Sequence, residues 1–256
     1  MGVSYEVIER VAHVTLDRPD RRNAMDLEVF ALLAEHAARI QADPTVGAVV
    51  VAGRDGTFSS GLDLTTLGGL LSEGLDPSLV ARLQATFTAY EELDIPVLAA
   101  IEGHCLGGGL QLALACHLRA VAPDAQLGLL EVRWGLVPDL GGTYRLPRLV
   151  GPGRATELAM TGRSVTAEEA LRGGLAELAL PAADALTAAH EHAARWAAGP
   201  GSIRRIPRLV RENLHRDRTG ALAAEIAAQS AAVEGPDVRE AVTARLEGRE
   251  PRFVGR

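Results

Sequence analysis

Two glycine-rich turns hold the residues of this sequence that could do chemistry, and each directly follows an apolar run. The first covers residues 57–64 (Thr-Phe-Ser-Ser-Gly-Leu-Asp-Leu), and the second lies between Ile101 and Gln111 and contains the triplet Gly107-Gly108-Gly109. The second turn opens an apolar helical stretch, so unpaired main-chain N–H groups and the positive end of a helix dipole are expected to meet there. The sequence therefore predicts a point that can hold negative charge.

Three kinds of glycine motif could hold that charge, and the residues exclude two of them. A phosphate-binding P-loop needs Lys and then Ser or Thr after its last glycine, but Gly109 precedes Leu110 and the whole chain lacks lysine. A dinucleotide turn, Gly-x-Gly-x-x-Gly, fails because its last position is Leu112. An oxyanion hole remains, with a purely structural glycine crossing as the alternative. The turn at 57–64 favours the oxyanion hole, because such a site needs two donors from separate places.

Four motifs in a fixed order narrow the interpretation further. They are Arg18-Pro19 with Asn23-Ala24-Met25, the Phe-x-x-Gly-x-Asp-Leu turn at 58–64, the triplet Gly107-Gly108-Gly109, and a Gly-x-x-Pro-x-x-Gly-Gly-Thr segment at 135–143. Together they resemble the signatures of the crotonase, or enoyl-CoA hydratase/isomerase, superfamily. The resemblance extends from about Ser4 to Phe253. Four motifs in this order identify the family far more specifically than any one of them does.

The resemblance implies an α/β fold of the crotonase type, a ββα spiral built as a superhelix of βαβ units, followed by a C-terminal helical trimerisation region. The apolar patterns agree with this: they predict a hairpin over 5–17 and buried strands over 46–52, 96–101 and 118–122. Helices are expected from Asp26 to about 41, over 65–73 and 77–93, and repeatedly from 151 onward. We predict a spiral core at 1–198 and a helical region at 199–256, with a variable acyl pocket between the helices at 65–73 and 77–93.

In the family, two main-chain N–H groups hold the thioester oxygen of the substrate. They belong to the residue after the glycine of the first turn and to the middle glycine of the triplet, which are Leu62 and Gly108 here. Removal of the proton on the carbon beside a thioester creates an enolate whose charge lies mostly on that oxygen, so these donors would stabilise it. The resemblance therefore implies an acyl-CoA-processing enzyme.

Three side chains decide which reaction follows. Hydratases carry one carboxylate at the position of Gln111, where this chain has an amide, and a second at the position of Glu131, which is retained. Asp139 follows eight residues later, a spacing similar to that of the Glu and Asp of dienoyl-CoA isomerases, although these also have Asp at the position of Gln111. Asp139 could instead cap the helix that starts near Gly142, or be the nucleophile of a dehalogenase, which is disfavoured because that subgroup has Trp where Glu131 stands.

Double-bond isomerisation of an enoyl- or dienoyl-CoA is the preferred interpretation, because a Glu and an Asp along the acyl chain suit proton transfer between distant carbons. An isomerase that uses Glu131 alone is equally compatible. One alternative is a 2-enoyl-CoA hydratase in which Gln111 positions water. Another is an acyl-CoA-binding protein with weak catalysis.

Further contacts to the acyl-CoA follow from the resemblance, residue by residue. The arginine-rich loop after Pro19 would supply a local basic patch for the phosphates of coenzyme A. The expected substrate contacts are Arg22, Ala24, Ser60, Asp63, Leu64, Gly107, Leu130, Pro138, Arg252 and Phe253. No prosthetic group is expected, and coenzyme A enters only as part of the substrate.

Bulk properties limit the partners. A formal net charge of −7 argues against nucleic acid, and no apolar run reaches the roughly 18 to 20 residues of a membrane span. The N-terminus does not resemble a signal peptide, so a cytoplasmic protein is expected, and the resemblance implies a homotrimer or hexamer. No metal site is expected, since His190 and His192 lie on different helix faces. Cys105 is interpreted as a packing residue rather than a nucleophile.

Overall fold

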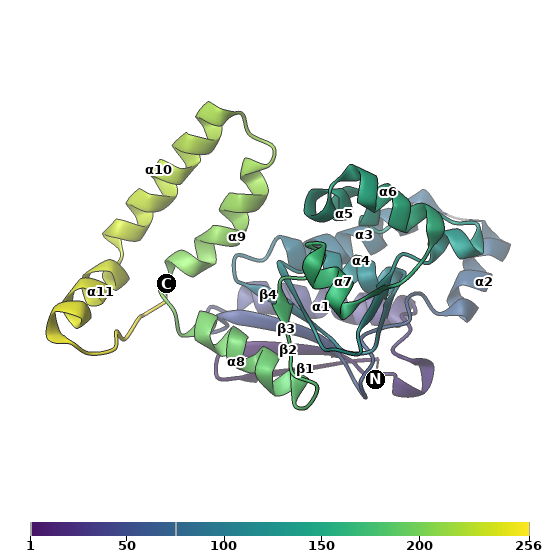
Figure 1. The fold of residues 1–256 in the computed structure, drawn as a ribbon, viewed down its shortest axis with the longest axis horizontal. Coiled ribbons are helices and arrows are strands. Elements are labelled where there is room, and N and C mark those ends of the chain that lie inside the picture. The colour runs from purple at the N-terminus through teal and green to yellow at the C-terminus, as the bar shows by residue number, and fades with distance from the viewer. Residues whose placement is uncertain (1, 75, 256) are drawn as a thin grey trace.

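A hairpin begins the larger of two sheets in the computed structural model, which describes residues 2–74 and 76–255 (Figure 1). β1 (Val3–Ile8) pairs antiparallel with β2 (Val11–Leu16), and the two residues between them, Glu9 and Arg10, have φ angles of 48° and 68°. Two central residues at positive φ are typical of a type I′ turn. The predicted hairpin is therefore confirmed.

The rest of the large sheet is parallel. Its order is β1-β2-β3-β4-β6-β9, with β3 (Ala48–Gly53), β4 (Val97–Ile101), β6 (Leu118–Val121) and β9 (Leu178–Ala179). Every residue of β3 and β4 is buried, as expected for parallel strands covered on both faces. The three strands predicted from apolar runs are confirmed.

A second, smaller sheet consists of β5 (His104–Leu106), β7 (Gln126–Gly128) and β8 (Val165–Thr166). An isolated bridge between Ser59 and Cys105 places the first glycine turn beside β5. The chain thus passes from the large sheet to the small one at β4–β5 and again at β6–β7, and from β3 to the bridge at Ser59. The two glycine turns follow Ser59 and β5, at the edge of this small sheet. The sequence did not predict these strands, because two or three residues are too few to show a period.

Helices cover both faces of the large sheet (Figure 1). α8 (Ala185–Ala197) packs on one face through small side chains, and Ala189 and Ala193 are fully buried there. On the other face lie α1 (Leu27–Ala42), α3 (Pro77–Glu91) and α4 (Gly108–Ala115). The remaining elements of the core are η1 (Pro19–Arg21), α2 (Leu64–Glu73), η2 (Glu131–Trp134), α5 (Gly142–Val150), α6 (Pro152–Thr161) and α7 (Ala167–Arg172).

Three C-terminal helices extend away from this core: α9 (Ser202–Asn213), α10 (Arg218–Glu234) and α11 (Pro236–Glu247) (Figure 1). Asp237 at the start of α11 ties the region together, because its carboxylate accepts hydrogen bonds from Gly201 N at 2.8 Å and Val254 N at 2.7 Å. The predicted helical region is present. Its boundary at residue 198 stays a prediction.

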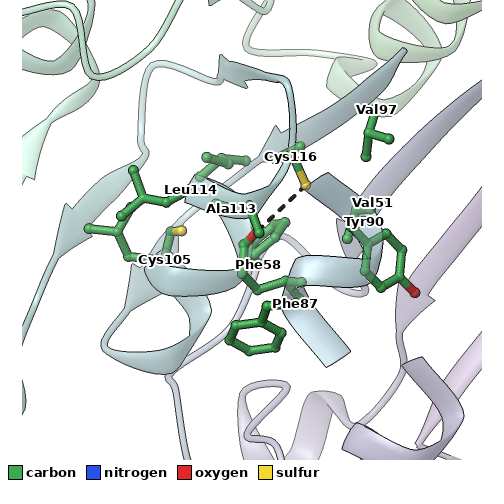
Figure 2. Packing of buried hydrophobic residues seen from close by; sticks show 14 of the residues in the cluster. Val51, Phe58, Phe87, Tyr90, Val97, Cys105, Ala113, Leu114 and Cys116 are labelled. Atoms are coloured by element: carbon green, nitrogen blue, oxygen red, sulfur yellow. Dashed lines mark hydrogen bonds between the residues drawn. The ribbon is translucent and has the colours of Figure 1, made fainter. Parts of the chain in front are cut away.

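Both cysteines lie inside the hydrophobic core, in the same cluster as Phe58, Phe87 and Tyr90 (Figure 2). Burial raises the pKa of both thiols, that of Cys116 to about 12 and that of Cys105 well above its usual range. A buried thiol that stays protonated is a poor nucleophile, which supports the packing role expected for Cys105. We expect an aromatic disulfide reagent to modify neither thiol in the native protein and both in denaturant. Rapid native modification would contradict this.

Candidate active site

The two glycine turns place two main-chain nitrogens side by side. A Cβ added to Gly61 would lie 3.3 Å from the nitrogen of Gly108, and one added to Gly108 would lie 3.7 Å from the nitrogen of Leu62. Gly61 and Gly107 have φ angles of 101° and 53°, which favour glycine. Within the described residues, neither the Leu62 nor the Gly108 N–H donates a hydrogen bond. The Gly108 N–H has no partner within α4, because Gly108 is the first residue of this helix.

Asn23 fixes the first turn against the loop that precedes α1. Its side-chain Oδ1 accepts from Arg18 N at 2.9 Å, and its Nδ2 donates to the carbonyls of Arg54 at 2.9 Å and Thr57 at 2.5 Å. Ser59 Oγ donates to the Asn23 carbonyl at 2.8 Å. This buried amide explains why the loop and the turn are held together and why the Asn-Ala-Met motif accompanies the glycine turns.

Close packing of α4 on the first turn requires glycine at position 109. A Cβ there would lie 2.8 Å from both Cβ and the carbonyl oxygen of Ser59. We expect Gly109→Ala to lower the free energy of unfolding by about 1–3 kcal/mol through overpacking. Gly153→Ala is the matched control, because Gly153 in α6 faces open space and alanine should stabilise a helix there by about 0.5–1 kcal/mol. Urea titration measures both changes, and equal effects would contradict the packing argument.

A cavity of about 590 Å³ opens beside the two nitrogens. It is lined by Leu62 and Gly108 together with all three candidate catalytic side chains, Gln111, Glu131 and Asp139. One wall is aliphatic and comes from α2, α3 and the segment after η2: Leu67, Leu70, Leu79, Val80, Leu83, Leu136 and Val137. The acyl pocket expected between the helices at 65–73 and 77–93 thus has a physical counterpart. The individual wall residues were not predicted, although Leu67 and Leu70, and Val80 and Leu83, share one face of a helix by their i, i+3 spacing.

Glu131 is the first residue of the short helix η2, which follows the end of β7 at Gly128. Burial raises the pKa of the Glu131 carboxyl, and the charge of Asp139 raises it further, against the hydrogen bond from Gln111. Its Oε2 is buried and has no hydrogen-bond partner among the described residues. A carboxylate oxygen that is unpartnered beside a cavity is a candidate base.

Asp139 lies at the rim of the cavity, where the residue is exposed to solvent. Partial burial of its carboxyl raises its pKa. The alternative role as a helix cap is wrong, because the N-cap of α5 is Gly141 and no side chain caps that helix. The main chain of Asp139 is held instead through its carbonyl, which accepts a hydrogen bond from Gln84 Nε2 at 2.5 Å.

Gln111 is buried at the back of the cavity and is 1% exposed. Its Oε1 accepts hydrogen bonds from the main-chain nitrogens of Leu140 and Gly142, both at 2.8 Å. Its Nε2 donates to Glu131 Oε1 at 2.6 Å. The side chain expected to position water is thus bound to protein groups on both ends.

Most of the predicted substrate contacts lie on the cavity wall. These are Arg22, Ala24, Ser60, Asp63, Leu64, Gly107 and Leu130. Asp63 also caps α2, accepting from Thr65 N at 2.9 Å. Burial alone would raise the pKa of the Asp63 carboxyl. The pKa is lowered instead by this hydrogen bond, by a second one from Thr66 N, and by the charges of Arg18 and Arg21.

Three further residues line the cavity wall and were not predicted: Arg21, Thr65 and Trp134. Arg21 could have been found, since it precedes Arg22 in the same basic loop.

Three predicted contacts lie elsewhere. Pro138 is buried behind the wall, where its Cβ lies 3.1 Å from the position of a Cβ on Gly142. Arg252 and Phe253 belong to the tail after α11, where Arg252 N donates to Glu240 Oε1 at 2.7 Å, and they do not line the cavity of their own chain. Their contact with the substrate stays a prediction.

Residues 2–74 and 76–255 show neither a metal site nor a membrane-spanning helix. No three His, Cys, Asp or Glu side chains lie together so that they could hold a metal ion. No helix in the same part of the chain is both long and apolar enough to cross a membrane.

Comparison with known proteins gives similarities along the whole chain. A sequence model of the family described as "Enoyl-CoA hydratase/isomerase" matches residues 6–256. A Bacillus subtilis protein, YngF, named as an enoyl-CoA hydratase/isomerase, is 37% identical over 249 residues, which cover 96% of this chain and 95% of that protein. The crystal structure of an enoyl-CoA hydratase from Bacillus anthracis superposes with a TM-score of 0.92 at 31% identity and 100% coverage of both chains. An enoyl-CoA hydratase from Polaromonas sp. JS666 has a TM-score of 0.92 at 27% identity, covering 98% of this chain and 99% of that one.

Proposed function

Because the chain belongs to the enoyl-CoA hydratase/isomerase family of enzymes, we propose that it binds an acyl-CoA thioester in this cavity and stabilises its enolate. The observation that carries the proposal is the pair of unpaired N–H groups of Leu62 and Gly108 beside the unpartnered Oε2 of Glu131. Two donors would hold the thioester oxygen while the carboxylate removes the proton at C2. Coenzyme A takes part only as a portion of the substrate, and no prosthetic group is invoked.

The reaction that this arrangement supports best is double-bond isomerisation. A glutamine amide has no proton to exchange at neutral pH, so Glu131 is the group near the donors that can accept one. Glu131 Oε2 takes the C2 proton, the electron pair moves into a dienolate, and a proton returns at C4 or C6 as the double bond shifts. Either Glu131 itself or Asp139 at the rim returns that proton.

Hydration of a 2-enoyl-CoA is the second candidate, and the names of the similar proteins favour it. Hydration requires a water held so that it can attack C3 and lose a proton. The Oε1 of Gln111 already accepts two main-chain hydrogen bonds, so the amide could only donate to such a water. Glu131 would have to take the water proton alone, which makes the geometry less suited to hydration than to isomerisation.

One assay separates these candidates. The purified enzyme is given 3-enoyl-CoA and 2-enoyl-CoA substrates of several chain lengths in D₂O, and deuterium at C2 and the products are followed by mass spectrometry. We expect deuterium exchange and conversion of 3-enoyl to 2-enoyl-CoA at enzymatic rates, with much slower hydration. Rapid hydration without isomerisation would establish the lyase. Tight binding without exchange would leave the catalytically weak binding protein.

Self-association as a homotrimer or hexamer is part of the proposal. It is supported by exposed apolar side chains on α9, at its C-cap and on α10: Ile206, Val210, Leu214, Leu222 and Ile226. Such side chains on projecting helices are expected to be covered by another copy. Light scattering coupled to size-exclusion chromatography gives the mass, and a monomer at micromolar concentration would contradict it. A cytoplasmic location also stays a prediction.

A further inference from the structure

We infer that Gln111 is a positioning residue that selects which oxygen of Glu131 reacts and keeps that carboxyl available to accept a proton. This inference rests on the proposed function of Glu131 as the base, and deepens it. It assigns Gln111 no contact with the reacting atoms. The argument depends on the chemistry of the groups around the amide and on what glycine allows at position 142.

The orientation of the amide follows from its partners. Main-chain N–H groups can only donate, so the atom that meets Leu140 N and Gly142 N must be the carbonyl oxygen Oε1. The NH₂ group is therefore the one that faces Glu131. Rotation of the amide by 180° would place its NH₂ group against two N–H donors and its carbonyl oxygen against a carboxylate oxygen, so a single orientation is compatible with the site.

The orientation of the amide determines the chemistry of the carboxyl. Because Nε2 donates to Glu131 Oε1 at 2.6 Å, Oε1 must act as an acceptor, and a proton taken up by this carboxyl must reside on Oε2. Oε2 is the buried oxygen with no partner among the described residues. Gln111 thus leaves one oxygen, in one place, for proton transfer.

Surrounding segments hold the amide rigidly. A Cβ on Gly142 would lie 2.9 Å from Gln111 Oε1, so glycine is needed for the main chain to approach the amide. Arg145 fixes the same segment from the other side, where its Nη1 donates to the Leu140 carbonyl at 3.0 Å and its Nε to Glu91 Oε2 at 2.8 Å. Gln111 therefore joins the start of α4, the base on η2 and the segment that carries Asp139.

A carboxylate in place of the amide would change the protonation of Glu131. The two N–H donors at Leu140 and Gly142 would favour the ionised form of a carboxyl introduced at position 111, which would face Glu131 at hydrogen-bond distance. Two anions cannot stay in contact, so the pair would share one proton and Glu131 would carry it. Asp139 is the other charged group acting on Glu131, and its negative charge acts in the same direction.

The test is the pH dependence of C2 deuterium exchange in the wild type and in Gln111→Glu and Gln111→Met. For Gln111→Glu we expect the midpoint to move up by about one pH unit or more, so that exchange falls by about tenfold at pH values below the wild-type midpoint and recovers at alkaline pH. Gln111→Met should lower kcat at every pH with KM little changed, because the carboxyl is no longer aimed. A midpoint that stays at the wild-type value in Gln111→Glu would overturn the inference.

A second measurement does not depend on activity or on the Gln111 variants folding. In wild-type enzyme labelled with ¹⁵N at glutamine side chains, the Gln111 NH₂ resonance should titrate with the ionisation of Glu131 and lose this titration in Glu131→Gln. A Gln111 resonance indifferent to pH would overturn the inference even if the enzyme isomerises well. Conversely, an amide that titrates in an enzyme without C2 exchange would support the positioning role and reject the proposed function.

Discussion

Glu131→Gln should slow exchange of the C2 proton of a bound acyl-CoA by about two to four orders of magnitude, the usual loss when a general base is removed. Glutamine keeps the size of the side chain but cannot accept a proton. Oε2 of Glu131 is the buried carboxylate oxygen at the cavity that has no hydrogen-bond partner among the described residues, so its loss removes the proposed base. The KM for the acyl-CoA should change little, since the proposed donors, the N–H groups of Leu62 and Gly108, are main-chain groups that the substitution leaves in place.

Asp139→Asn is the control for this experiment. Its carboxyl lies at the rim, so most C2 exchange should persist, whereas isomerisation should fall if Asp139 returns the proton. The two variants thus separate removal of the proton from its return. Equal exchange in Glu131→Gln and the wild type would remove Glu131 from the mechanism.

Glu131→Gln should also change the stability of the fold, and the sign of the change follows from the raised pKa of Glu131. Because burial raises the pKa of Glu131, the folded state binds more protons than the unfolded chain between the two pKa values, so the carboxyl lowers stability as pH rises through that window. Glu131→Gln should therefore unfold at higher urea concentration than the wild type at neutral pH. The difference should shrink at pH values below the unfolded pKa. A less stable variant at neutral pH would show that the carboxyl has a structural role.

How much of this site was visible in the sequence depends on the range of the interactions. The two glycine turns could be found because each is local, with Gly61 and Gly107 at positive φ, whereas the choice of Leu62 and Gly108 within them came from the family resemblance. The partners of Gln111 are 20 to 31 residues away, at Glu131, Leu140 and Gly142, and no local pattern records them. A sequence shows that an amide replaces a carboxylate there, but not that both of its ends are bound.

In the fold, too, features with a local sequence pattern were predicted and the others were not. The all-buried β3 and the hairpin were predicted because a continuous apolar run and an alternating one are distinct patterns. The short helix η2 that carries Glu131 was not predicted, because its neighbours Leu130 and Val132 are apolar although Val132 is 40% exposed. Apolar neighbours in the sequence therefore do not establish a buried segment where the chain turns toward a cavity.

Gly108→Pro should lower kcat by about 10²–10³-fold, the usual effect of losing one donor of an oxyanion hole. Proline is tolerated at the first position of a helix, where its missing N–H is not needed for helix hydrogen bonds, and Gly108 occupies that position in α4. Gly107 before it has no Cβ for the proline ring to strike. Proline is the one substitution that removes a main-chain N–H donor.

Gly108→Ala keeps the N–H and serves as the matched control. Its Cβ would approach the Cε of Met25 at 3.2 Å, and this methyl group ends a flexible side chain that can move aside. Alanine therefore tests the added bulk alone, and melting temperatures of both variants test the fold. If proline and alanine were equally active, the N–H of Gly108 would not bind the developing negative charge. The enolate would then depend on Leu62 alone, and the side-by-side nitrogens would be a feature of packing rather than of catalysis.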